Sequence, residues 1–122
     1  MYVEGEFAKM WISEGIFYFV YKPFKVIDYR SAIAIVNQRM ELQNGSSYPI
    51  FCDLREVDNA HKQARDYLST EGSFLMKALA ILVKNEHASA ILKMYIQTSM
   101  VHCPTAIFTE KNKAIEFLKD YK

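Results

Sequence analysis

The chain has 122 residues, of which 51% are hydrophobic and 24% charged, and its 15 basic and 14 acidic side chains leave a formal net charge of +1. This composition is that of an ordinary globular protein, and the length predicts a single domain over residues 1–122. The balanced charge provides no long-range attraction to nucleic acid or anionic lipid, so we expect no nucleic-acid partner.

The first part of the chain predicts a β-hairpin. Residues 6–12 (EFAKMWI) and 16–22 (IFYFVYK) are rich in aromatic and β-branched side chains, which favour strands. The short segment 13–15 (SEG) between them is a typical hairpin connection. Pro23 should end the second strand, because its nitrogen cannot donate to a strand ladder.

From Asp28 onward the hydrophobic period changes to that of a helix. Asp28 is a good N-cap, and the pair Asn44-Gly45 predicts the end of the helix. The apolar side, which should pack on a sheet, is expected to carry Tyr29, Ala32, Ile33, Val36 and Met40. The opposite, solvent-facing side is expected to carry Arg30, Asn37, Arg39 and Glu41.

The rest of the chain alternates strands with helices. Strands are predicted over 48–54 (YPIFCDL) and 78–84 (ALAILVK), each covered on both faces, and over 105–109 (TAIFT). A helix is predicted from about Asn59 to Thr70, capped by Asp58 or Asn59. Two more helices should follow the caps Asn85 and Thr109, the first packing through Ala88, Ile91, Leu92, Tyr95 and Ser99. The order β-β-α-β-α-β-α-β-α predicts an α/β fold with a mixed, mostly parallel sheet flanked by helices.

Cysteine use and hydropathy restrict the class of protein further. Cys52 and Cys103 form no Cys-x-x-Cys pair, so neither a disulfide framework nor structural zinc is expected. No glycine-rich nucleotide-binding pattern occurs, and we expect no cofactor. The N-terminus does not have the pattern of a signal peptide, and no apolar run approaches the roughly 20 residues that span a bilayer. We therefore expect a cytoplasmic protein without membrane insertion.

Five stretches together resemble STAS-like domains, the fold of bacterial anti-sigma-factor antagonists. They are FAKMWISEGIFYFVYKP, the helix from Asp28, PIFCDLREVDNAHKQAR, ALAILVKN and IFTEKNKAIEFLKDY. The likeness is to an uncharacterised bacterial branch, and it implies a non-catalytic regulatory or scaffolding domain that acts in signalling through protein–protein contacts. Signalling members carry a phosphorylatable Ser or Thr in an Asp-Ser-x-Gly context. Asp53 matches the acidic position, but residues 54–58 (LREVD) contain no Ser, Thr or Gly, so the usual phospho-switch should be absent.

The junction after the strand at 48–54 is the candidate binding site for a partner or ligand. A strand end and a helix N-terminus meet there, and such places favour anions. The candidate residues are Asp53, Arg55, Asp58, His61 and Arg65. The alternative is structural: Asp53 pairs with Arg55 or Arg65 and pins the helix to the strand.

Three other functions remain open at this junction. The first is a carrier or sensor of an apolar or anionic small molecule, and the second is an enzyme that uses Asp53 and His61 as an acid/base pair. The third is a receiver-like phosphoacceptor at Asp53, which would need further carboxylates to hold a divalent ion, and the first strands offer no acidic pair. The scattered histidines His61, His87 and His102 predict no metal site.

The aromatic strand IFYFVY raises the question of what covers it. Consecutive strand residues point to opposite faces, so one face of this strand needs a helix, a ligand or a second copy of the chain. We expect a homodimer.

Overall fold

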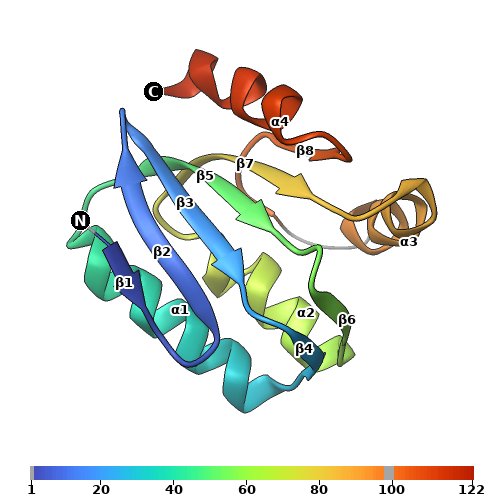
Figure 1. Ribbon diagram of the computed structural model, residues 1–122. Helices are drawn as coiled ribbons and strands as arrows, with labels where there is room; N and C mark the ends of the chain where they lie inside the picture. Colours follow the sequence, from blue (N-terminus) through green and yellow to red (C-terminus); the bar gives the residue numbers. More distant parts are fainter. Residues whose placement is uncertain (1, 98–100) are drawn as a thin grey trace.

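The computed structural model describes residues 2–97 and 101–122, and these form one layered α/β structure (Figure 1). The main sheet has six strands: β1 (Tyr2–Glu4), β2 (Ala8–Ser13), β3 (Ile16–Tyr21), β5 (Tyr48–Asp53), β7 (Met76–Leu82) and β8 (Thr105–Phe108). The helices are α1 (Tyr29–Gln43), α2 (Lys62–Ser69), α3 (Glu86–Gln97) and α4 (Lys111–Leu118), with 3-10 turns η1 (Glu71–Ser73) and η2 (Lys119–Tyr121).

The sheet is mixed and mostly parallel, as the sequence predicts. Its strand order is β1-β2-β3-β5-β7-β8; the first three strands are antiparallel, and β3, β5, β7 and β8 run parallel. The predicted hairpin joins β2 to β3, with Ser13 opposite Ile16. Glu14 and Gly15 between them have positive φ values of 49° and 82°. That backbone twist suits a two-residue hairpin turn, and glycine adopts it without steric cost.

A second, two-stranded sheet was not predicted. It pairs β4 (Phe24–Ile27) in parallel with β6 (Val57–Ala60), and it corrects the boundary of the following helix. Asp58 and Asn59, predicted as its caps, lie in β6, and α2 begins only at Lys62 after the N-cap His61. The physical reason is long-range pairing: β4 draws residues 57–60 into an extended ladder, and the His61 N–H donates to Ile27 O at 2.9 Å.

Helix α1 has the predicted ends but a different buried side. Asp28 accepts a hydrogen bond from the Ser31 N–H at 2.8 Å, and Asn44 ends the helix in the left-handed region at φ 47°. The buried residues are Ala32, Ile35, Val36, Arg39 and Gln43. The prediction that Arg39 faces solvent is therefore wrong: it is only 3% exposed.

The last two helices also follow the sequence with local corrections. Asn85 caps α3, since its Oδ1 accepts from the Ala88 N–H at 2.8 Å. Of the predicted contact residues, Ile91 is 39% exposed and Ser89 is buried in its stead, while Ser99 lies outside the described residues. Helix α4 begins after Glu110 and not directly after Thr109, which the sequence suggested as the cap.

Two hydrophobic clusters lie on opposite faces of the main sheet. One lies under α1 and α2 and includes Phe17 and Ile50; the other lies under α4 and includes Phe51 and Leu118. Ile50 and Phe51 are neighbours in β5 and each is 1% exposed, which confirms the predicted burial of this strand on both faces. Figure 1 shows α4 on the side of the sheet opposite α1 and α2. No helix in the described part of the chain is long and apolar enough to cross a membrane.

Candidate functional site

The predicted junction begins with a close ion pair at the end of β5. Asp53 is 6% exposed, and its carboxylate accepts hydrogen bonds from the Arg55 backbone N–H at 3.0 Å and from Arg55 Nη2 at 2.7 Å. Arg55 Nε also donates to Asp53 Oδ1 at 3.0 Å. Hydrogen bonding to Asp53 raises the pKa of Arg55 above its usual value. The Asp53–Arg55 pair of the structural alternative is present, but it closes the turn between β5 and β6 and is not a contact between the strand and a helix.

The other three predicted residues do not converge on this pair. Asp58 lies exposed on β6, and His61 is exposed at the start of α2 without a side-chain cap hydrogen bond. Arg65 donates from Nη1 to Ala60 O at 2.6 Å, and its guanidinium carbon lies 3.9 Å from the ring centroid of Tyr95 on α3. Within the described residues, no group of three or more His, Cys, Asp and Glu side chains could hold a metal ion.

Arg65 instead lines a cavity of about 160 Å³ between the main sheet and helices α1, α2 and α3. The cavity floor is formed by side chains of β3, β5 and β7, and its other walls by the three helices and η1. Most of the lining is apolar, for example Phe19, Ile50, Ile81, Ile35, Leu68 and Leu92. This is the face of the sheet away from α4, where the buried cluster with Ile50 lies.

Arg39 is the most unusual group in the cavity wall, because it is a buried cation. Its guanidinium donates to Gln43 Oε1 and to two carbonyl oxygens, Gly72 O at 2.6 Å and Phe74 O at 3.2 Å. Among the five ion pairs between described residues, none involves Arg39. Burial lowers the pKa of Arg39 to about 10, so the side chain stays protonated at neutral pH.

Cys52 and Tyr21, two further ionisable groups of the cavity wall, are neutral. Burial raises the pKa of Cys52 to about 12, which keeps the thiol protonated and unreactive as a nucleophile. Burial also raises the pKa of Tyr21 well above its usual value. The wall therefore combines apolar surface, neutral polar groups and two guanidinium cations, Arg39 and Arg65.

Sequence reasoning missed Arg39, although the helical spacing contained a signal. Arg39 follows Ile35 by four residues and Ala32 by seven, so the three lie on one side of α1. Gln43, four residues further, continues the same side and is 2% exposed.

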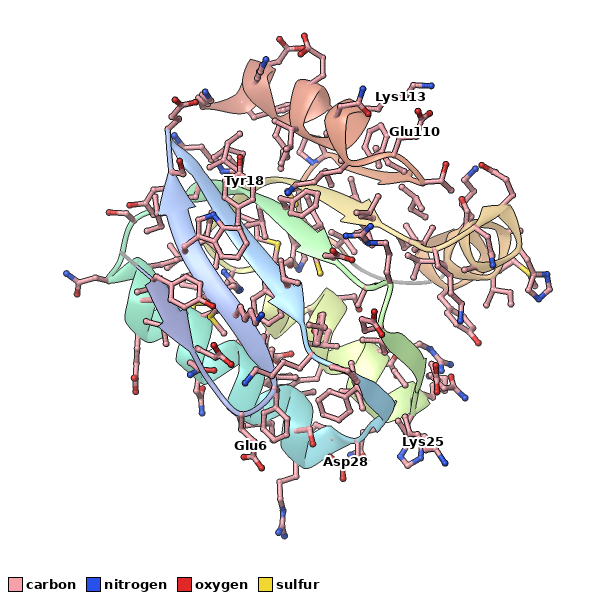
Figure 2. The ribbon with its side chains drawn as sticks, in the orientation of Figure 1. Glu6, Tyr18, Lys25, Asp28, Glu110 and Lys113 are labelled. Atoms are coloured by element: carbon pink, nitrogen blue, oxygen red, sulfur yellow. The ribbon has the colours of Figure 1, made fainter. Side chains whose placement is uncertain are left out.

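A second surface feature is an aromatic row on the α4 side of β1, β2 and β3. The ring centroids of Tyr2 and Trp11 are 6.0 Å apart, and Trp11 stacks on Tyr18 at 5.1 Å with an interplanar angle of 5°. Figure 2 shows Tyr18 lying over the sheet in this region. Helix α4 packs on the strands at the other edge of the sheet, β5, β7 and β8. Tyr2, which belongs to the aromatic row, is 57% exposed.

Comparisons with known proteins bear on the family and the fold. Residues 10–122 match a family described as a domain of unknown function (DUF7793). No curated protein matches the chain. A crystal structure with a similar fold is that of an uncharacterised protein of the DUF3478 family from Shewanella loihica, described as having a SpoIIAA-like fold. The two share 14% identity over 91% of each chain, with a TM-score of 0.67. The likeness confirms the predicted STAS-like fold.

Proposed function

The chain belongs to the DUF7793 family of domains of unknown function, and from its STAS-like fold and its cavity we propose that it is a non-catalytic regulatory domain that binds a small, largely apolar molecule. Ligand binding would regulate the contacts that the domain makes with a protein partner. A SpoIIAA-like fold is consistent with a regulatory domain.

The observation that carries this proposal is the apolar cavity. An apolar cavity of about 150 Å³ in a protein core is enough to bind benzene. The cavity here measures about 160 Å³ and is bordered by side chains from both the sheet and three helices. Binding sites for small molecules are typically concave and apolar with a few polar groups, and the guanidinium groups of Arg39 and Arg65 supply such groups here.

The geometry of the Asp53 corner supports a non-catalytic function. An acid/base reaction through Asp53 and His61 would need a carboxylate available to a substrate, but the Asp53 carboxylate accepts several hydrogen bonds from Arg55. A receiver-like phosphoacceptor would need the same carboxylate beside a divalent ion. The side chain that faces Asp53 is a cation of the protein itself, which favours a structural role for the pair.

Toluene is a suitable probe for the cavity, because it is apolar and close to benzene in size. We expect saturating toluene to raise the melting temperature of the protein by about 5 °C, since a ligand that binds only the folded state stabilises it. Ile81→Trp should abolish the shift, because Ile81 lines the cavity and the indole would fill it. Thermal unfolding followed by circular dichroism measures both effects.

Ile91→Trp is the matched control for this experiment. Ile91 is 39% exposed and is not part of the cavity lining, so this variant should keep the toluene shift. Absence of a shift in the unmodified protein, or an equal shift in Ile81→Trp, would contradict the proposed function.

The aromatic row supports a second proposal, self-association through the α4 side of β1, β2 and β3. Charges of both signs flank the row, since Glu4 and Lys9 are cross-strand neighbours. A second copy related by a twofold axis can therefore offer an aromatic surface and opposite charges to the same patch. This surface would give the homodimer that the sequence predicts.

Sedimentation equilibrium at micromolar concentration tests the dimer. We expect the unmodified chain to sediment as a dimer and Tyr2→Lys as a monomer, because the added cation has to be desolvated in the contact. Phe74→Lys is the control, since Phe74 is 66% exposed at a different place in the structure. A monomer of the unmodified chain would remove this proposal and leave the cavity proposal intact.

A further inference from the structure

We propose that the ligand of the cavity is a small monocarboxylic acid with an apolar body, and that its carboxylate binds the guanidinium of Arg39. This inference rests on the proposed function, and it adds the chemical class of the ligand. Three features of the cavity carry it: a buried charge that no carboxylate of the described residues pairs with, the donors that this charge leaves unused, and the size of the apolar space.

The first feature is the absence of a charge partner for Arg39 within the described part of the chain. No carboxylate there lies within 4.0 Å of the guanidinium, although the side chain is 3% exposed. Burial of a charged group is costly, and proteins usually compensate it with an opposite charge. A bound carboxylate would supply the missing charge.

The second feature is the number of donors on the Arg39 guanidinium. Such a group has five N–H donors. Three hydrogen bonds to neutral oxygens hold it in place, one to Gln43 on α1 and two to the backbone around η1. The Nε–H and one Nη1 N–H are thus left, on different edges of the group, and Arg39 is part of the cavity wall, so a bound carboxylate would accept one hydrogen bond from it. A hydrogen bond between a guanidinium and a carboxylate is charge-assisted, and such bonds are roughly twice as strong as those between neutral groups.

The rest of the wall favours an anion over a cation. Cys52 and Tyr21 line the cavity near Arg39 and are protonated at neutral pH, because burial raises the pKa of both groups. Among the described residues the lining includes no Asp or Glu side chain, and Arg65 adds a second cation. An anionic head group would therefore meet attraction and no like charge, whereas an ammonium group would be repelled.

The third feature is size, which limits the apolar body of the acid. A space of about 160 Å³ accommodates one benzene-sized group. Benzoate is therefore an appropriate probe, because it joins such a body directly to a carboxylate. Benzamide is the neutral analogue of nearly the same shape, and toluene tests the apolar space alone.

Titration calorimetry of the unmodified chain with these three probes tests the inference without any substitution. We expect benzoate to bind about 30-fold more tightly than benzamide, as a charge-assisted hydrogen bond contributes that much. Equal affinities for benzoate and benzamide, with toluene bound, would overturn the carboxylate inference and leave the proposed function standing. Failure of all three probes to bind would overturn both.

Arg39→Met then tests which cation is responsible. The variant should lose about 30-fold in benzoate affinity and keep its affinity for toluene, which also reports that the cavity has folded. Arg30→Met is the control, because Arg30 is an exposed arginine on the same helix and should leave both affinities unchanged. An Arg39→Met protein that still prefers benzoate over benzamide would overturn the assignment. If this variant does not fold, the comparison of probes on the unmodified chain decides the question.

Discussion

Alanine in place of Ile50 or of Phe51 is expected to lower the free energy of unfolding by several kcal/mol in each case. Large-to-small substitutions in a core cost about 2–5 kcal/mol for Ile→Ala and about 3–5 kcal/mol for Phe→Ala. Ile50 and Phe51 are consecutive in β5 and each is 1% exposed, but they belong to different clusters. Ile50→Ala should fall at the lower end of its range, because Ile50 already borders the cavity.

Urea unfolding of the two variants measures this effect. The informative result is that substitution of either of two neighbours in one strand strongly lowers the free energy of unfolding. In a sheet covered on a single face, only every second residue would have such an effect. Phe74→Ala serves as control, since its ring is 66% exposed and should cost little. A small effect at either Ile50 or Phe51 would contradict the two-sided core.

The main sheet could be predicted because its strands carry strong local signals. Residues 48–52 and 78–83 are unbroken apolar runs, and Glu14-Gly15 provides a turn between two aromatic strands. Helix α1 was predicted at both ends because capping depends on only a few neighbouring residues. These features depend on residues close in the chain, and the structure contains them with small shifts.

The strands that were missed depend on partners far away in the chain. Val57–Ala60 includes Asp58 and Asn59, which are poor strand formers, and it becomes a strand because it pairs with Phe24–Ile27 more than 30 residues earlier. Tyr2–Glu4 is only three residues long, too short to show a period of two. Local preference favoured a helix start near Asn59, and tertiary pairing overrode it.

The same difference between local and long-range interactions applies to the side chains of the candidate site. The Asp53–Arg55 pair spans two residues and is close to a local motif, so a structural pair was among the predicted alternatives. The burial of Arg39 was not predicted, because a charged side chain on a helix is expected to face solvent. Its acceptors Gly72 O and Phe74 O lie 33 and 35 residues away in the chain, and only the packing of η1 against α1 brings them near.

The Asp53 corner yields the second stability prediction, and it is asymmetric. Asp53→Ala should cost about 2 kcal/mol, because it removes charge-assisted hydrogen bonds and leaves Arg55 free to be hydrated. The Arg55 side chain is 51% exposed, whereas that of Asp53 is 8% exposed. Arg55→Ala should therefore cost more, about 3 kcal/mol, since it leaves a buried carboxylate without its partner. Urea unfolding at neutral pH compares the two variants.

The asymmetry separates a structural pair from a recognition site. If the pair holds the β5–β6 turn in shape, removal of either side chain should destabilise the folded protein. The two single substitutions should also be strongly non-additive, because the double variant removes both charges at once. Unchanged unfolding in Asp53→Ala would mean that the turn does not need the pair. Contact with a partner would then be the role left for the carboxylate. The Asp53–Arg55 pair would become a better candidate binding site than the cavity.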